Sequence, residues 1–505
     1  MLPLISPGTM RDMAQRYFTA TGTPSIQLME RAARALCDAI LRRYGPGLKV
    51  AFACGPGGNG GDGYACARMY AEAGGDCALL SSEPPRSPDA AENLRRARAA
   101  GIRETKIEEL PGPPDVWVDA LYGTGLSRAP EGVAAALIGR MNADRARGSA
   151  VVAVDIPSGL DGATGAAWTP CVTADATFTF QFAKSGHWLA DGLDACGDVE
   201  VLDIGIPSPF FPGGMAALME AEDVRAALPR TRRNVHKGTN GHLLIVAGSM
   251  GMAGGAALCA LSALRSGAGL VTVACPASVL PILQMLAPCA MGISLPERDG
   301  AIAPEAVEVL RAALPGKRAV VCGCGLSRRA APEVIRTLLE CGLPALFDAD
   351  ALNLIAADPE LRALLRPRHL ITPHPGEAAR LLGRMPSGDP IADAFALQAL
   401  GCQALLKGAA SVVPVGDSAV ISASGGSGMA KGGSGDCLAG LAGGLMAALA
   451  SSDEGLSGIA LAKCAAVASE IHGLAGEIAQ AKRGIRGMCA MDIVDALPEA
   501  LSRYA

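Results

Sequence analysis

The nine residues Gly55–Gly63 read GPGGNGGDG and follow a short apolar run, Lys49–Cys54. A glycine-rich turn between an apolar run and a helical pattern, here Tyr64–Ala73, is typical of a strand–turn–helix unit that binds an anion. A tight turn without any ligand would use the same glycines. Asn59 and Asp62 favour a ligand, because their side-chain oxygens can contact a cation or a hydroxyl group as glycine cannot.

Two further apolar runs end in polar turns. VDALYGTGLSR spans Val118–Arg128 and places Asp119 near the end of its strand. VAVDIPSGLDGATG spans Val151–Gly165, with Asp155 at the strand's end and Ser158 in the turn. Strands that alternate with helices predict a parallel sheet, whose carboxyl ends share one edge. We therefore expect the three loops to form one site, although Asp155 could also be only a turn-forming residue.

The second half of the chain has its own polar turns after apolar runs. They are CGCGL (Cys322–Leu326), FDADALN (Phe347–Asn353), TPHPGE (Thr372–Glu377), LKGAAS (Leu406–Ser411) and GMAKGGSGD (Gly428–Asp436). In the last, GGSG opens a long helix of small residues, so free N–H groups and the helix dipole would face a phosphoryl group with Asp436 beside them as a base. Alone, a glycine-rich helix start more often serves packing, and His374 could be a buried, hydrogen-bonded histidine. Lys407 and His374 at the ends of other strands favour catalysis.

The length and composition indicate several ordered domains. A chain of 505 residues, 50% hydrophobic and 18% charged, is too long for one compact core and too apolar to be disordered throughout. The sequence PSPFFPGG at 207–214 has the composition of a linker. We therefore predict two α/β domains, residues 1–218 and residues 219–505.

Charge and cysteine usage narrow the partners and the compartment. The formal net charge is −5 and there is no polybasic run, so a nucleic-acid partner is disfavoured. Sixteen scattered cysteines and no signal-peptide pattern fit a reducing cytoplasm. Glycines or prolines interrupt the two uncharged runs, 243–264 and 266–296, so we expect no membrane span. We also expect a homo-oligomer.

The three motifs of the first half resemble the epimerase domain of the NAD(P)H-hydrate repair enzymes, whose glycine loop usually reads NNGGD. The resemblance implies a Rossmann-like three-layer domain that interconverts the R and S hydrates of NADH and NADPH (NADHX and NADPHX). Asp155 would contact the altered ring and act as acid and base. By the same resemblance, the hydrate would be bound by Gly58, Asn59, Gly60, Gly61, Asp62, Gly123, Thr124, Gly125, Leu126, Ser127, Arg128, Ala129 and Asp155.

The resemblance also implies a potassium site. Asn59, Asp119 and Ser158 match the positions that hold the ion, in line with the preference of hard cations for oxygen ligands. One residue departs from the family pattern, because Gly58 replaces the first Asn of NNGGD. The lost side-chain hydrogen bond would weaken substrate orientation by roughly 0.5–1.5 kcal/mol, which is too little to abolish activity.

The second half, over roughly 225–505, resembles the ribokinase-like fold and, more narrowly, the dehydratase domain of the same enzymes. The resemblance implies that ADP or ATP phosphorylates the hydroxyl of the S hydrate and that phosphate then leaves, which restores the C5–C6 double bond. Asp436 would deprotonate that hydroxyl, and Ala256, Gly325, His374 and Asp436 would line the hydrate pocket. The nucleotide would be held by Lys407, Gly408, Ala409, Ala410, Ser411 and Gly435.

Magnesium would accompany the nucleotide phosphates, although no acidic pair in the sequence identifies its ligands. Two cysteines depart from the family pattern in this half: Cys324 replaces the proline of GPGL, and Cys289 replaces a common glutamate. An alternative remains, in which a ribokinase-like kinase phosphorylates a small metabolite and the first domain is a non-catalytic binding or dimerisation module. The presence of Asn59, Asp119, Asp155 and Ser158 together argues against that module.

Overall fold

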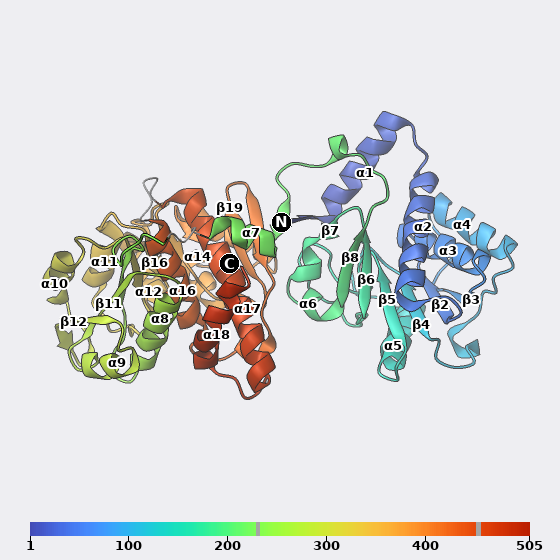
Figure 1. Ribbon diagram of the computed structural model, residues 1–505. Coiled ribbons are helices and arrows are strands. Elements are labelled where there is room, and N and C mark those ends of the chain that lie inside the picture. Colours follow the sequence, from blue (N-terminus) through green and yellow to red (C-terminus); the bar gives the residue numbers. More distant parts are fainter. Residues whose placement is uncertain (229–232, 451–455, 505) are drawn as a thin grey trace. The chain divides into compact units, whose positions relative to one another are not determined.

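The computed structural model describes residues 1–228, 233–450 and 456–504, and the chain divides into two compact units (Figure 1). The first unit is Leu2–Ala216, and the second is Ala217–Ala505 together with Met1.

The first unit alternates strands and helices. Its strands are β1 (Leu2–Ile5), β2 (Lys49–Cys54), β3 (Asp76–Ser81), β4 (Val116–Ala120), β5 (Ala150–Val154), β6 (Ala176–Phe180), β7 (Ala183–Lys184) and β8 (Asp198–Leu202). Its helices are α1 (Pro7–Thr21), α2 (Ser25–Tyr44), α3 (Gly58–Glu72), α4 (Pro88–Ala99), α5 (Gly132–Arg145) and α6 (Gly192–Ala195).

A parallel sheet of order β3-β2-β4-β5-β6-β8 forms the middle layer of this unit. Alternate residues of a strand face opposite sides of a sheet. Accordingly, Val116 and Val118 of β4 pack in the cluster that contains α2 and α3, whereas Trp117 packs with α5. The chain order reverses at β2, so the crevice between β2 and β4 is the expected ligand site. The expected three-layer α/β fold is confirmed.

The second unit is also α/β. Its strands are β9 (Ala216–Leu218), β10 (His242–Val246), β11 (Leu270–Pro276), β12 (Met291–Leu295), β13 (Glu297–Arg298), β14 (Ala301–Ile302), β15 (Ala319–Cys322), β16 (Ala345–Phe347), β17 (His369–Ile371), β18 (Gln403–Ala404), β19 (Ser411–Val415) and β20 (Ser418–Ser422). Its helices are α7 (Ala221–Ala227), α8 (Ala253–Arg265), α9 (Leu280–Leu286), α10 (Ala306–Ala313), α11 (Pro332–Glu340), α12 (Ala349–Ala357), α13 (Pro359–Arg362), α14 (Pro375–Leu382), α15 (Pro390–Gln398), α16 (Ser434–Leu449), α17 (Gly458–Arg483) and α18 (Ala490–Ser502).

Seven parallel strands, in the order β12-β11-β10-β15-β16-β17-β18, form the sheet of this unit. The helix α16 packs directly on the sheet and on α8, because its glycines leave room. A Cβ on Gly443 would lie 2.2 Å from Val321 Cγ2, and one on Gly440 would lie 2.1 Å from Cys259 O. The small residues of α16 therefore bring its first turn close to the carboxyl edge of the sheet.

The helix α17 is long and apolar enough to cross a membrane by length and composition. Of its apolar window, 72% is buried inside the fold, as in the core helix of a soluble protein. Its buried residues, among them Leu461, Val467 and Ile471, belong to the core cluster that contains α16 and α18.

Candidate active sites

The glycine segment after β2 differs from its predicted structure, because α3 begins at Gly58 and not at Tyr64. The turn is therefore limited to residues 55–57. A Cβ on Gly60 would lie 1.9 Å from Gly55 O, and one on Gly63 would lie 2.8 Å from Cys54 Sγ. These glycines thus allow the helix to approach the strand. The predicted hydrate-binding residues 58–62 begin α3, and the backbone N–H groups of its first residues, 58–60, lack partners within the helix, whereas the Gly61 N–H donates to Gly57 O at 3.1 Å.

Asp155 follows β5 in a left-handed backbone conformation, with φ of 64°. Its side chain is 13% exposed. Its Oδ1 accepts hydrogen bonds from Thr179 Oγ1 at 2.9 Å, from the Phe180 N–H at 3.3 Å and from Lys184 Nζ. The Lys184 side chain is fully buried. Asp155 is therefore an ion-paired carboxylate that still reaches the surface.

His187 fixes the backbone of Asp155. Its Nδ1 accepts a hydrogen bond from the Lys184 N–H at 3.3 Å, so Nε2 carries the proton and donates to Asp155 O at 3.0 Å. Burial, with the nearby Lys184 ammonium, lowers the pKa of His187 to about 4. The imidazole therefore stays neutral and holds the left-handed residue in place.

Two carboxyl groups of this unit have pKa values shifted in opposite directions. Burial would raise the pKa of Asp155, but the Lys184 ammonium and the Thr179 hydroxyl outweigh it and hold the pKa below its ordinary value. Burial and the Asp155 charge raise the pKa of Asp62 well above its ordinary value. The two environments therefore favour the charged form of Asp155 and the neutral form of Asp62.

Asp119 and Ser158 are in direct contact. The Ser158 N–H donates to Asp119 Oδ2 at 2.7 Å, and Ser158 Oγ donates to Oδ1 at 2.6 Å. Burial raises the pKa of Asp119 to about 6 despite these hydrogen bonds, and the carboxylate has no ion pair among the described residues. Asn59 approaches from α3, since a Cβ on Gly123 would lie 3.2 Å from Asn59 Oδ1. The Asn59 amide nitrogen is buried without a partner.

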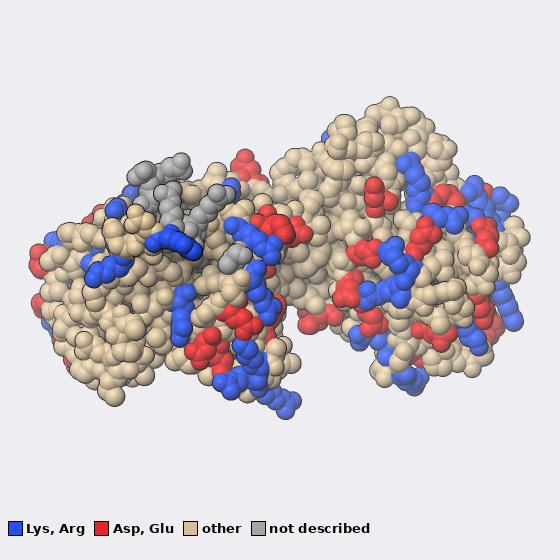
Figure 2. Space-filling model, in the orientation of Figure 1, with Lys and Arg blue, Asp and Glu red and all other residues tan. Residues whose placement is uncertain are grey.

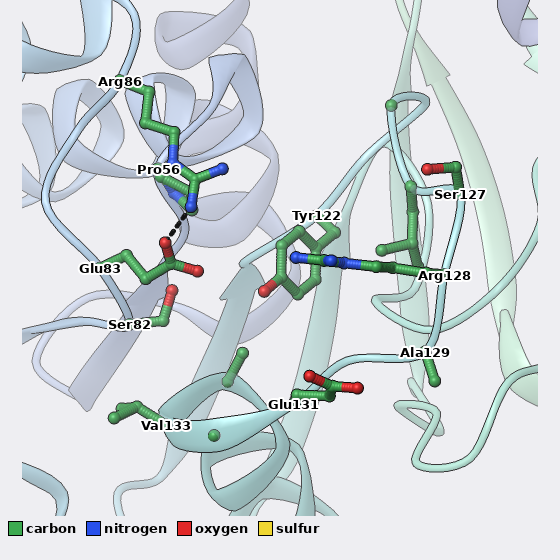
Figure 3. Close-up of a pocket in the computed structure, with 14 residues that line it drawn as sticks. Pro56, Ser82, Glu83, Arg86, Tyr122, Ser127, Arg128, Ala129, Glu131 and Val133 are labelled. Carbon is green, nitrogen blue, oxygen red and sulfur yellow. Dashed lines mark hydrogen bonds and ion pairs between the residues drawn. The ribbon is translucent and has the colours of Figure 1, made fainter.

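A cavity of about 550 Å³ opens beside these residues (Figure 3). It includes Gly125, Leu126, Ser127, Arg128 and Ala129, which are five of the predicted hydrate-binding residues. Gly123, Thr124 and Asp155 are not part of its lining. The remaining lining residues are Pro56, Ser82, Glu83, Arg86, Tyr122, Glu131, Gly132, Val133 and Ala134.

In the second unit, Asp436 lies in the first turn of α16. The residue before this helix, Gly433, has φ of 96°, which favours glycine. A Cβ on Gly255 would lie 3.1 Å from Asp436 Oδ2 and 3.3 Å from Gly325 N. The carboxylate therefore faces the start of α8 and the turn after β15, where Gly325 lies.

Lys407 lies among carboxylates. Its Nζ is 2.7 Å from Asp348 Oδ1 and 3.9 Å from Glu377 Oε2. A Cβ on Gly435 would lie 3.4 Å from the same Nζ, so the lysine reaches the N-terminus of α16. Burial, and then repulsion from Asp348, raises the pKa of Asp436 to about 6. A base with this pKa is largely ionised at neutral pH and can accept a proton.

The other predicted residues of this unit are less closely grouped. The methyl group of Ala256 is buried and faces Gly248, where a Cβ would lie 3.3 Å away. His374 precedes α14, its Nδ1 accepts from the Gly376 N–H at 3.0 Å, and its side chain is 53% exposed. The loop from Gly408 to Ala410 leads into β19 at Ser411.

Two family models match this chain, one in each of its two units. The family model for the YjeF-related protein N-terminus matches residues 25–186, and that for NAD(P)H-hydrate dehydratase matches residues 243–499. A bifunctional NAD(P)H-hydrate repair enzyme of Moorella thermoacetica is 37% identical over 502 residues, which cover 95% of this chain and 92% of that protein. The chain belongs to the bifunctional NAD(P)H-hydrate repair enzymes.

Other comparisons agree with the family. The repair enzyme of Escherichia coli K12 is 35% identical, over 84% of this chain and 81% of that protein. A ribokinase-like superfamily protein of Enterococcus faecalis V583 matches 58% of this chain and 98% of its own, with a TM-score of 0.50 and 21% identity, which shows the fold of the second unit. The alternative of a small-metabolite kinase with a non-catalytic first domain is therefore set aside.

The structure places several residues in the two sites of this repair enzyme to which the sequence analysis assigned no role. Lys184 and His187 lie in the stretch FQFAKSGHW after β6 and carry no predicted role. Their only signal in the sequence is a lysine within an apolar stretch, because buried lysines are rare unless paired. Asp348 and Glu377 lie within quoted motifs, but only the fold shows that both meet Lys407.

Proposed function

We propose that residues 1–218 interconvert the R and S hydrates of NADH and NADPH, and that residues 219–505 dehydrate the S hydrate at the expense of ADP or ATP. The observation that carries this proposal is the pair Asp155 and Asp436. Each is a partly accessible carboxylate at the carboxyl edge of a parallel sheet, in a polar site whose charges tune its pKa.

In the first unit, the stereocentre carries a hydroxyl group next to the ring nitrogen. Protonation lets that hydroxyl leave as water, while the nitrogen lone pair forms a C=N bond. Water then adds to the other face of the ring and gives its proton to a base. Asp155, whose pKa Lys184 holds below its ordinary value, is suited to be the base, and Asp62, whose pKa burial raises, is suited to be the acid. The remaining hydrate-binding residues of the first unit would orient the dinucleotide.

A potassium ion fits the first unit. Asp119 is a fully buried carboxylate without a positive partner among the described residues; Ser158 Oγ contacts it, and Asn59 Oδ1, which lies near Gly123, adds a further oxygen. These three residues would hold the ion. Bound there, it would compensate the charge of Asp119 and fix the turns that carry the site.

In the second unit, Asp436 would take the proton of the hydrate's hydroxyl as its oxygen attacks the terminal phosphoryl group of the nucleotide. Free N–H groups at the start of α16 and the Lys407 ammonium would stabilise the charge on the transferred group. Phosphate then leaves from C6 as a C5 proton departs, so the double bond returns. Gly435 and the segment 407–411 would hold the nucleotide, beside the hydrate at Ala256, Gly325 and His374.

Magnesium would enter this site with the nucleotide. No group of three or more His, Cys, Asp or Glu side chains able to hold a metal lies within the described part of the chain. Mg²⁺ is commonly bound by substrate phosphates and one or two carboxylates. Asp348 and Glu377, which flank Lys407, would supply those carboxylates.

The test is to incubate the protein with the R hydrate of NADH and ADP. We expect the absorbance of reduced nicotinamide to return, because the first unit converts R to S and the second dehydrates S. A stable phosphorylated product with no recovery would contradict the dehydratase assignment. Recovery from S but not from R would contradict only the epimerase assignment.

We further propose a homo-oligomer in the cytoplasm. Ile282, Met285, Leu286 and Met291 are exposed on α9 and the edge strand β12. Charged side chains are sparse over this region (Figure 2). Sedimentation of the protein and of Met285→Glu would test the oligomer, which the charge should dissociate.

The compartment is inferred from the cysteines. Sixteen free cysteines, mostly buried, fit a reducing compartment.

A further inference from the structure

The cavity in Figure 3 lies where the chain order of the first sheet reverses. Pro56 follows β2, Ser82 and Glu83 follow β3, and Tyr122 follows β4. These strands are neighbours in the sheet. In open parallel sheets, a nucleotide binds outside the carboxyl ends of the strands at such a reversal. The cavity is therefore placed to hold one end of the dinucleotide whose other end meets Asp155.

Glu83 lies where many dinucleotide-binding α/β folds carry an acidic residue that contacts the ribose. It lies twenty residues after Gly63, the last glycine of the loop, and it is the second residue after the end of β3. In dinucleotide-binding α/β folds, an acidic residue at this spacing accepts a hydrogen bond from the ribose 2′-hydroxyl, and an arginine nearby accommodates a 2′-phosphate. Glu83 lines the cavity, so both the spacing and the geometry fit that use.

Two arginines share the cavity with Glu83. Arg86 is ion-paired with Glu83 on one wall, and both side chains are largely exposed, at 69% and 42%. Arg128 projects from the loop after β4, beside Tyr122, and forms no ion pair with any described residue. Glu131 also lines the cavity. The guanidinium groups of Arg86 and Arg128 can therefore both bind a phosphate group in the cavity if Arg86 turns away from Glu83.

We propose that this cavity binds the adenosine ribose of the hydrated dinucleotide, with Glu83 reading the 2′-hydroxyl of the NADH hydrate and Arg86 with Arg128 reading the 2′-phosphate of the NADPH hydrate. The inference rests on the proposed epimerase activity of this unit. The Glu83–Arg86 pair accounts for acceptance of both hydrates, because each member serves one of them.

The test measures kcat/KM for R to S conversion of the two hydrates separately. Arg86→Gln should lower kcat/KM for the NADPH hydrate about ten-fold relative to the NADH hydrate, since a charged hydrogen bond is lost. Glu83→Gln should shift the ratio the other way, because Arg86 is released from its ion pair and the 2′-hydroxyl loses a charged acceptor. The matched control is Arg95→Gln, which breaks a similar exposed pair, Glu92–Arg95, on α4 outside the cavity.

An equal loss for both hydrates in Arg86→Gln, or an unchanged ratio in both variants, would overturn the inference. Arg86 is exposed, so its substitution leaves the core intact, and an unchanged thermal melt of the full chain reports that the first unit is still folded. A wild-type protein that interconverts neither hydrate would instead contradict the proposed epimerase. The two failures are therefore distinguishable.

Discussion

The ammonium group of Lys184 is fully buried and donates to Oδ1 of Asp155, the residue that follows β5. It also donates to Thr179 Oγ1 at 2.8 Å and to Phe180 O at 3.4 Å. The Lys184–Asp155 ion pair favours the carboxylate form of Asp155, because burial alone would raise its pKa and favour the neutral acid.

Replacement of Lys184 by Met should move the acid limb of the epimerisation profile to higher pH. In the native protein the pKa of Asp155 is below its ordinary value, so the base persists as the pH falls. Without the ammonium, burial raises that pKa and the base is lost at a higher pH. The rate of R to S conversion against pH measures the shift, and dehydration of the S hydrate is the control. An unmoved acid limb would show that Lys184 has only a structural role.

Asp155→Ala should abolish interconversion while dehydration of the S hydrate continues. Loss of a general base typically costs 10²- to 10⁴-fold in rate, roughly the effect expected here. Separate assays with the R and S hydrates check this, because only the first requires the epimerase. If R to S conversion persisted at the native rate, Asp155 would have no part in the mechanism.

The sequence predicts the strands and turns of this protein well, because apolar runs ending in glycines are local signals. It places Asp119, Asp155 and Asp436 correctly at strand or helix ends, as the structure shows. It does not predict where α3 begins, since glycine favours a turn locally, whereas the helix start packs closely on its surroundings at Gly60, Gly61 and Gly63. The Lys184–Asp155 pair is likewise a tertiary contact between segments 29 residues apart.

Asp436→Asn should eliminate dehydration without changing the thermal melt, because the amide has nearly the shape of the carboxylate but cannot take a proton. In the native protein, dehydration should fall as the pH drops through about 6, since the raised pKa of Asp436 means that the base is protonated below that value. The recovery of reduced nicotinamide from the S hydrate and ADP measures both effects. Persistent dehydration in the variant would place the base elsewhere.

Potassium should raise the melting temperature of the first unit. An ion that binds only the folded state at about 100 times its Kd stabilises by about 2.7 kcal/mol. Thermal melts in potassium and in choline at equal ionic strength measure the effect. In Asp119→Asn the response should disappear, because the buried charge that attracts the ion is gone. A response that survives this substitution would locate the ion elsewhere.

Gly58→Asn should strengthen hydrate binding without loss of stability, whereas Gly60→Ala should destabilise the first unit. A Cβ on Gly58 meets no atom within 4 Å, so asparagine fits and can restore a hydrogen bond of roughly 0.5–1.5 kcal/mol. A Cβ on Gly60 would lie 1.9 Å from Gly55 O, so the helix must move away from the strand. The KM for the R hydrate and the thermal melt of both variants separate the effects. An unchanged KM in Gly58→Asn would mean that this position does not contact the hydrate.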